Sequence, residues 1–298
     1  MFTRHYAHWP PGQPKALEIP QVTVYRNLAA IAERDPEHTA IDYYGSRVSY
    51  RELKRQVDAL AGYLQQRAGV AQGDRILLYL QNSPQFVIAY YAILRADAVV
   101  VPVNPMNRTE ELRHYVSDCG AKLAIVGQDV LQHIEPMRDL QQFLVTAYSD
   151  YLGSPNELPL PQFVKAERQA RADSWKRAID AGLAPGAHAA GPDDLAVMPY
   201  TSGTTGKPKG CMHTHSSVQA TTVPYLNWRG ARARSVVLSA LPMFHVTGMQ
   251  AGMNAPIHAG ATLVILSRWD RDCAALQIER AKVTNWPAIT TMPPGSRS

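Results

Sequence analysis

The residues best suited to chemistry lie in one loop, 201–210, which follows the strand-like run 195–200. Its glycines permit positive φ and a close backbone approach, so that consecutive N–H groups can converge on an anion. Hydroxyl donors and positive charge stand beside them. The sequence therefore predicts a phosphate-binding loop, and its candidate nucleotide-binding residues are Thr201, Ser202, Gly203, Thr204, Thr205, Gly206, Lys207 and Lys209.

Two other kinds of loop share part of this composition. Clusters of Gly, Ser and Thr are usually flexible linkers, but two lysines and an adjoining strand argue against that. A Walker A loop has the pattern G-x-x-x-x-G-K-[ST], which requires glycine where Thr201 stands and serine or threonine where Pro208 stands. The loop fails at both positions, so a P-loop NTPase is disfavoured.

Composition excludes several other classes of protein. The chain has 298 residues, 46% of them apolar, and a net charge of +5, with the basic residues spread along its length. That distribution argues against a nucleic-acid partner and suits small anions. We predict no transmembrane segment, because Arg95 and Asp97 interrupt the best apolar run. The N-terminus lacks the apolar region of a secretory signal, so a cytoplasmic location is expected.

The elements that must position the loop alternate between helical and strand periods from Tyr43 onward. This alternation predicts an α/β fold with doubly wound, mainly parallel sheets in two stacked subdomains. Predicted strands cover 75–80, 98–103, 122–126, 195–200, 235–241 and 261–266. Predicted helices follow the caps Ser49, Ser83 and Asp270 and cover 109–120 and 164–181.

A change of texture between about 150 and 192 indicates a subdomain boundary, with several prolines, a charged segment and then a run of Ala, Gly and Pro. We therefore expect residues 1–192 to form a first α/β subdomain with an N-terminal extension. Residues 193–292 would begin a second α/β subdomain that carries the phosphate-binding loop. Cys119, Cys211 and Cys273 lie far apart, so neither a disulfide framework nor a zinc site is expected.

The segment 200–210 resembles, nearly letter for letter, the signature of the adenylate-forming (AMP-dependent synthetase/ligase) superfamily. Leu241-Pro242-Met243-Phe244-His245-Val246-Thr247-Gly248 is similar to that family's second core motif, whose histidine lies beside the acyl pocket. Taken alone, a histidine after an aromatic residue is more often a hydrogen-bonded core residue. Upstream, 49–64, Asn82-Ser83-Pro84 and Val103-Asn104-Pro105 are also similar to the family's N-terminal segment.

The resemblance implies an acid–thiol ligase with ATP, Mg²⁺ and coenzyme A. A carboxylate attacks the α-phosphate of ATP to give acyl-AMP, and the thiol of CoA then takes the acyl group. It implies a catalytic and substrate-contacting role for His245 and a metal contact for Thr201. Similarity at 282–286 and 290–292 favours the fatty-acyl-CoA synthetase branch, where Trp286 would stand at the entry of the acyl chain. Simple packing of Trp286, a nucleotide-binding module without catalysis, and a ligase for an aryl or other carboxylic acid stay open.

The resemblance stops after Met292, and Pro293 to Ser298 form a tail unlike the family. Full-length members carry an acidic metal-site motif, a ribose-binding aspartate, a hinge and a C-terminal domain with a catalytic lysine, none of which occurs here. We therefore expect an N-terminal part of a synthetase, truncated by a frameshift, an early stop or a cloning boundary. Such a chain would be defective in adenylation but able to bind ATP weakly. A homodimer and a peripheral membrane contact stay open.

Overall fold

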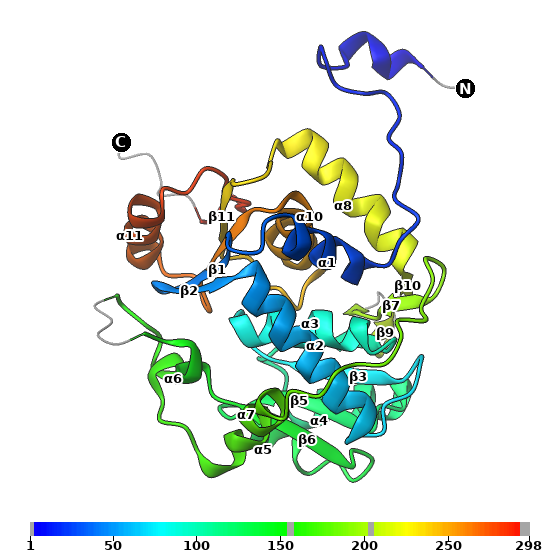
Figure 1. Ribbon diagram of the computed structural model, residues 1–298, viewed down its shortest axis with the longest axis vertical. Helices are drawn as coiled ribbons and strands as arrows, with labels where there is room; N and C mark the ends of the chain where they lie inside the picture. The colour runs from blue at the N-terminus through cyan, green and yellow to red at the C-terminus, as the bar shows by residue number, and fades with distance from the viewer. Residues whose placement is uncertain (1–2, 154–157, 202–205, 293–298) are drawn as a thin grey trace.

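The computed structural model describes residues 3–153, 158–201 and 206–292 (Figure 1). Its strands are β1 (Thr39–Tyr43), β2 (Ser46–Ser49), β3 (Arg75–Tyr79), β4 (Val99–Pro102), β5 (Leu123–Gly127), β6 (Gln142–Thr146), β7 (Leu195–Val197), β8 (Tyr200–Thr201), β9 (Lys209–Gly210), β10 (His213–Thr214), β11 (Val236–Ser239) and β12 (Thr262–Ile265). Its α-helices are α1 (Val24–Arg34), α2 (Tyr50–Gln66), α3 (Pro84–Arg95), α4 (Thr109–Cys119), α5 (Leu131–Ile134), α6 (Gln162–Lys165), α7 (Asp173–Asp180), α8 (His215–Arg229), α9 (Val246–Met249), α10 (Ala255–Ala259) and α11 (Arg271–Ala281).

Short helices of other types complete the described elements: the 3₁₀ helices η1 (Arg4–His8), η2 (Tyr148–Tyr151) and η3 (Ala170–Ala172), and the π-helix η4 (Gln250–Asn254). None of the helices that the structure describes combines the length and the hydropathy needed to cross a bilayer.

Among the described residues the strands form two main sheets and a small hairpin. The first sheet has the order β10-β7-β4-β3-β5-β6, and the second has the order β11-β12-β1-β2. Strands pair in parallel within both, except at the edges, where β10 and β2 run antiparallel to their neighbours. Strands β8 and β9 pair separately as an antiparallel hairpin. The predicted α/β class with mainly parallel sheets is confirmed.

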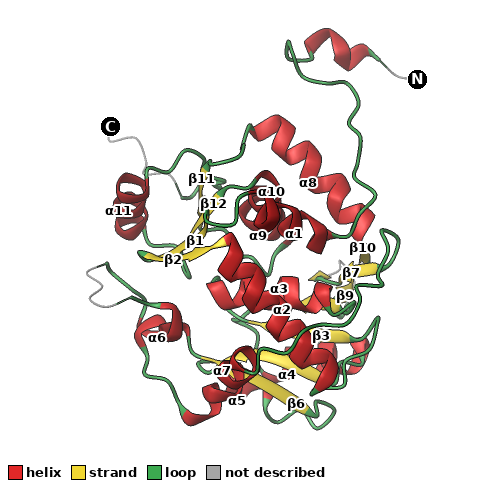
Figure 2. Ribbon diagram, in the orientation of Figure 1, coloured by secondary structure: helices red, strands yellow, loops and turns green. Residues whose placement is uncertain are grey.

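Helices α2 and α3 lie between the two sheets (Figure 2). Alternate residues of β3 face opposite ways: Ile76 and Leu78 join the core that includes α2 and α3, whereas Leu77 and Tyr79 join a second core beneath α4. Both faces of β3 are therefore covered, as expected for a parallel sheet with helices on each side. The helix predicted after Ser49 is α2, and its apolar residues Leu53, Val57, Leu60 and Leu64 are buried.

The predicted division near residue 192 does not separate the two sheets. Strands β7 and β10, which follow it, complete the first sheet, whereas β1 and β2, which begin the α/β pattern, complete the second. Ile41 of β1 pairs with Leu263 of β12. Order along the chain suggested two consecutive subdomains, but pairing across the sheets depends on long-range contacts that a linear pattern does not encode.

Side-chain caps begin the helices predicted after Ser49, Ser83 and Asp270, and a glycine ends the helix predicted over 109–120. The Ser49 hydroxyl accepts from the Glu52 N–H (3.2 Å), the Ser83 hydroxyl from the Phe86 N–H (3.1 Å) and the Asp270 carboxylate from the Cys273 N–H (2.8 Å). Gly120 ends α4 in the left-handed region with φ +65°. A single residue type at one position was enough to predict each of these ends.

The helix predicted over 164–181 is wrong in its middle. The structure has α6 and α7 with η3 before α7, and the backbone between α6 and η3 forms no helix. Distant side chains bond to the backbone there: the Gln169 N–H donates to Gln128 Oε1 (2.9 Å), and the Ser149 hydroxyl donates to the Ala166 carbonyl (2.9 Å). Tertiary hydrogen bonds thus replace those of a continuous helix.

Acid should destabilise the fold through His215, the first residue of α8. Burial, together with the adjacent His188, lowers the pKa of His215 to about 4, and its Nδ1 accepts from the Val24 N–H (3.2 Å). Because the unfolded chain binds a proton more readily, this contribution is complete above about pH 6.5 and is lost as the pH falls towards 4. It amounts to about 3 kcal/mol at most. Urea unfolding between pH 7 and 4 should show a steeper loss in the natural chain than in His215→Gln, and equal slopes would contradict this.

Candidate active site

The predicted phosphate-binding loop is carried by the β8–β9 hairpin. Tyr200 pairs with Gly210 and Thr201 with Lys209, so the two ends of the loop are held side by side. Beyond the hairpin, the Cys211 N–H donates to the Pro199 carbonyl (2.9 Å). Ser202, Gly203, Thr204 and Thr205 lie outside the described residues, so their predicted role in phosphate binding stays a prediction.

Two positions of this loop require glycine for different structural reasons. Gly206 has φ +154°, a conformation that residues with a side chain rarely adopt, and a Cβ there would meet no atom of the described residues within 4 Å. Gly210 lies in β9, where a Cβ would come within 3.1 Å of the Met198 side chain and 3.3 Å of Tyr200 Cζ. The first glycine therefore provides an unusual backbone conformation, and the second allows the hairpin to approach the end of the first sheet.

A cavity of about 390 Å³ brings the two predicted motifs together. Thr201 and Pro208 of the phosphate-binding loop line it, and so do Phe244 and His245 of the second motif. Its remaining walls come from the end of β4 and the segment after it, from α4, from β8 and the residue before it, and from α9: Pro102, Asn104, Asn107, Tyr115, Pro199, Tyr200 and Val246. Residues separated by more than forty positions in sequence thus share one concave site of the size that small molecules occupy.

His245 stands at the start of α9 with an exposed side chain. Its Nδ1 accepts from the Thr247 N–H (3.3 Å), and its backbone N–H donates to the Pro242 carbonyl (3.1 Å). Because Nδ1 acts as an acceptor, the ring proton of the neutral imidazole is assigned to Nε2. That nitrogen can donate a hydrogen bond to an anionic oxygen in the cavity.

A second cavity of about 510 Å³ lies along the loop itself and is lined by His114, Asp118 and residues 206–210. Lys207 and Lys209 are exposed there. From 195 to 269 the sequence contains no Asp or Glu, so the only charged side chains of this long segment are basic. The field around the loop therefore favours an anionic ligand.

The hydroxyl of Tyr200, which lines the first cavity, donates to the carboxylate of Asp118, which lines the second (2.6 Å). Burial, together with that carboxylate, raises the pKa of Tyr200, so the phenol stays protonated and remains a donor. One oxygen of the Asp118 carboxylate therefore already accepts a hydrogen bond from the Tyr200 hydroxyl. For Mg²⁺, the residues that line the two cavities offer the Thr201 hydroxyl, two asparagine side chains and one carboxylate, that of Asp118, which already accepts a hydrogen bond. This set does not by itself make a magnesium site. The described residues contain no cluster of three or more His, Cys, Asp or Glu side chains that could hold a metal.

Trp286 is not brought to the cavity of Thr201 and His245. It stacks on Trp269, with ring centroids 5.5 Å apart and planes 18° apart. It lines a separate cavity of about 230 Å³ with residues that include Tyr225, Arg229 and Asn285. The role of Trp286 at the entry of an acyl chain stays a prediction.

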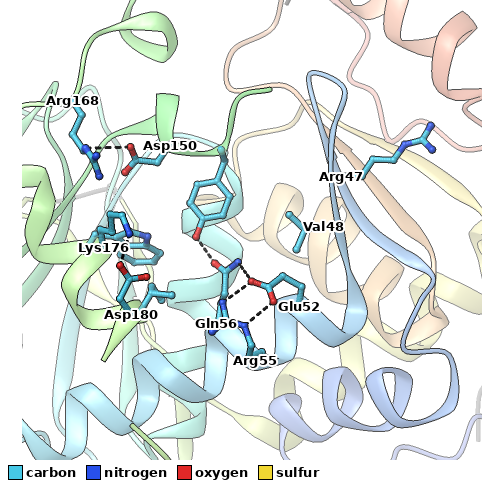
Figure 3. Close-up of a pocket in the computed structure, with 12 residues that line it drawn as sticks. Arg47, Val48, Glu52, Arg55, Gln56, Asp150, Arg168, Lys176 and Asp180 are labelled. Carbon is cyan, nitrogen blue, oxygen red and sulfur yellow. Dashed lines mark hydrogen bonds and ion pairs between the residues drawn. The ribbon is translucent and has the colours of Figure 1, made fainter. Parts of the chain in front are cut away.

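The largest of these cavities, about 520 Å³, lies elsewhere, between β2, α2 and α7 (Figure 3). Most of its charged side chains pair with one another: Arg55 with Glu52 (2.7 Å) and Arg168 with Asp150 (3.6 Å), while Lys176 contacts Asp180. The remaining one, Arg47, pairs with Asp42 outside the cavity (3.5 Å). None of the predicted site residues lines it. Because its charges are already matched, this crevice lacks the unbalanced charge that would attract an ionic ligand.

Sequence reasoning missed three residues that organise the site. Asn82 belongs to the Asn82-Ser83-Pro84 motif, but that motif does not reveal that its buried amide bonds the loop before His245. Nδ2 donates to the Leu241 carbonyl (2.9 Å), and Oδ1 accepts from the Met243 N–H (2.8 Å). His114 and Asp118 contact the phosphate-binding loop from α4. Their spacing of four residues, which places both on one face of a helix, was an available signal.

Lys207 should matter for anion binding and hardly at all for folding. Its side chain is exposed, and it forms no ion pair with any described residue. Lys207→Ala should change the free energy of unfolding by less than about 0.5 kcal/mol, as at other surface sites. The same change should weaken ATP binding about tenfold, because a charged hydrogen bond is lost. Urea unfolding and equilibrium dialysis with labelled ATP measure the two effects, with exposed Lys15→Ala as control. A large loss of stability with unchanged ATP binding would contradict the assignment.

Together, fold and site define a class: an α/β protein that presents a Gly- and Lys-containing hairpin beside a parallel sheet, next to a histidine-lined cavity. The chain belongs to the AMP-binding enzyme family, whose model matches residues 28–293.

Curated relatives agree with this assignment. A long-chain-fatty-acid–CoA ligase of Bacillus subtilis is 32% identical over 96% of this chain and 53% of its own length. A 4-coumarate–CoA ligase-like protein of Oryza sativa is 32% identical over 82% of this chain and 42% of its own length. The chain thus spans about half the length of the curated relatives it matches.

Solved structures share the fold. The inhibitor-bound N-terminal domain of FACL13 from Mycobacterium tuberculosis superimposes with a TM-score of 0.76 at 25% identity, covering 91% of this chain and 64% of that one. A long-chain-fatty-acid-CoA ligase (FadD1) from Archaeoglobus fulgidus gives a TM-score of 0.75 at 25% identity, covering 93% of this chain and 54% of that one.

Proposed function

We propose that this chain forms the ATP- and acid-binding part of an AMP-forming acyl-CoA synthetase. The observation that carries the proposal is the single cavity shared by Thr201 and Pro208 of the loop and by His245. A carboxylate held beside His245 would lie next to phosphates held by the loop. The reacting groups would then meet without a covalent enzyme intermediate, which makes positioning and charge neutralisation the main tasks of the protein.

In the proposed reaction, a carboxylate oxygen attacks the α-phosphorus of ATP, and the bond to the departing pyrophosphate breaks. The thiolate of CoA then attacks the carbonyl carbon of acyl-AMP and releases AMP. Lys207 and Lys209 would neutralise phosphate charge, and His245 Nε2–H would donate to the carboxylate or the α-phosphate. Mg²⁺, whose only proposed protein contact here is Thr201, would be bound chiefly by phosphate oxygens.

The acid is proposed to be a fatty acid. The named ligases of Bacillus subtilis and Escherichia coli, at 32% and 30% identity, act on long-chain fatty acids. The Oryza sativa relative makes an aryl acid the competing substrate class. A cytoplasmic location is also proposed, since ATP and CoA are substrates and the chain's three cysteines are free thiols. The homodimer and the peripheral membrane contact stay predictions.

The test is calorimetric binding of a nonhydrolysable acyl-adenylate analogue, dodecanoyl-sulfamoyl adenosine, to the 298-residue chain. The analogue should bind at least about a hundredfold more tightly than AMP, because it fills both halves of one site. His245→Ala should weaken its binding about tenfold. The control is His8→Ala, which changes an exposed histidine of η1 outside the cavity.

Each other outcome changes the conclusion. Equal affinity for the analogue and AMP would leave only a nucleotide-binding module. Tighter binding of a cinnamoyl analogue than of the dodecanoyl one would replace the fatty acid with an aryl acid. Failure of the folded chain to bind ATP, AMP or either analogue would refute the proposal.

A further inference from the structure

One face of α4 contacts both ends of the phosphate-binding loop. His114 and Asp118 stand one helical turn apart on this face, and both line the cavity that also contains Lys207 and Lys209. Their contacts are with Pro208 and Tyr200, which lie at the two sides of the hairpin. Helix α4, which packs against the first sheet, thus also contacts the phosphate-binding loop through side chains on another of its faces.

The contact at the first end involves two side chains of α4. The Tyr200 hydroxyl donates to Asp118 Oδ2 (2.6 Å), and the Tyr200 ring stacks on Tyr115, with centroids 4.3 Å apart and planes 23° apart. A bond to a charged acceptor is stronger than one between neutral groups. The stacked rings add contact area and restrict the rotation of Tyr200.

The contact at the second end is a single hydrogen bond to the backbone. His114 Nε2 lies 2.7 Å from the Pro208 carbonyl oxygen. A carbonyl only accepts, so this nitrogen carries the proton and donates whether or not the other ring nitrogen is protonated. Pro208 follows Lys207 directly, so the bond restrains the backbone that carries the lysine.

Helix α4 is itself well anchored, which makes it a suitable support. Leu112, Tyr115, Val116 and Cys119 are buried against the first sheet. At its start, the Glu111 carboxylate accepts from the Arg108 N–H (2.8 Å), and the Thr109 hydroxyl donates to the His133 carbonyl (3.0 Å). The buried face fixes the helix, and the opposite side presents His114 and Asp118 to the loop.

We propose that His114, Tyr115 and Asp118, the α4 clamp, are positioning residues that hold the two sides of the β8–β9 hairpin, at Tyr200 and Pro208, in the arrangement that accepts a polyphosphate. The clamp acts through Tyr200 and Pro208 and does not itself need to touch the ligand. For its ligand the proposal rests on the proposed function. The described hairpin backbone at 206–210 is then ordered before the ligand arrives, so that binding costs less conformational entropy.

Hydrogen exchange of the unliganded chain tests the clamp without any ligand. In His114→Phe and Asp118→Ala, the amides of 206–211 should exchange about tenfold faster than in the natural chain, because each variant loses one restraint. Exchange in β5 should not change. The matched control is Ser117→Ala, because the Ser117 hydroxyl, also on α4, bonds only the His114 carbonyl (3.1 Å).

Binding of inorganic tripolyphosphate provides the second measurement. His114→Phe and Asp118→Ala should each raise its Kd about fivefold to tenfold. His114→Gln, which keeps a donor, should restore most of the affinity. Asp118→Asn should bind at least as tightly as the natural chain, because the amide oxygen still accepts from Tyr200 and a negative charge beside Lys207 is removed. A role in bulk stability alone would not produce this difference between Asn and Ala.

The outcomes separate the clamp from the proposed function. If exchange at 206–211 is faster in the two variants but the natural chain binds no tripolyphosphate, the result would support the clamp and count against the synthetase assignment. Unchanged exchange at 206–211 would overturn the clamp whatever the binding result. Faster exchange in β5 to the same extent would also overturn it, since the variants would then act on the whole fold.

Discussion

Replacing Asn82 with leucine should lower the free energy of unfolding by about 4 kcal/mol. The amide is buried, with 4% of the residue exposed. Its Nδ2 donates to the carbonyls of Leu241 (2.9 Å) and Leu266 (3.2 Å), and its Oδ1 accepts from the Met243 N–H (2.8 Å). Leucine makes none of these bonds, so three buried backbone groups would lose their partner, at about 1–3 kcal/mol each before relaxation.

Urea unfolding measures this effect. The matched control is Asn227→Ala at an exposed site on α8, where the amide bonds only its own helix (3.0 Å) and the expected change is less than about 0.5 kcal/mol. Because Asn82 bonds the loop that precedes His245, any Asn82→Leu protein that remains folded should also bind the dodecanoyl analogue poorly. A loss of stability below about 1 kcal/mol would show that water replaces the amide.

Gly248→Ala should be nearly as damaging, for a steric reason. A Cβ at Gly248 would lie 2.0 Å from the Pro242 carbonyl oxygen and 2.5 Å from its carbon, so the backbone itself would have to move. That carbonyl accepts from the His245 N–H (3.1 Å), so the turn that holds His245 would be distorted. We expect a loss of about 3 kcal/mol, typical of severe overpacking.

Gly252→Ala is the control for this steric argument, because a Cβ there would find its nearest neighbour, Ser239 Cβ, at 3.8 Å. That is ordinary contact, and alanine is the better helix former, so Gly252→Ala should be neutral or slightly stabilising. Thermal unfolding distinguishes the two substitutions. Similar melting temperatures for both variants would contradict the prediction, because they would mean that the backbone at 241–242 shifts at little cost in free energy.

Signals confined to a few residues allowed much of the fold to be predicted. Ser49, Ser83, Asp270 and Gly120 mark helix ends because a cap depends on one side chain or one φ value. Runs such as 75–80 and 261–266 indicate buried strands by composition alone. The break between α6 and α7 was not predictable in this way, since Gln128 and Ser149 bond that backbone from distant positions.

The residues of the candidate site also differ in whether a local sequence signal predicts them. Thr201 and His245 were predicted from two motifs, and the structure places both in one cavity. Trp286 was predicted from a third segment, but it lines another cavity and stacks on Trp269. His114 and Asp118 belong to no motif, and the motif that contains Asn82 does not indicate what its side chain bonds. Their importance comes from which carbonyls and hydroxyls they meet, and only the folded chain shows those partners.

The pairing of β1 with β12 has a consequence for synthesis on the ribosome. Ile41 meets its partner Leu263 only after roughly 220 further residues have been made, which takes about 10 to 40 seconds at ordinary elongation rates. During that interval β1 and β2 can form at most a two-stranded hairpin, which is marginally stable alone, with the parallel edge of β1 open. The nascent chain therefore exposes a hydrophobic strand edge for most of its translation, which makes it a natural client for chaperones that shield such edges.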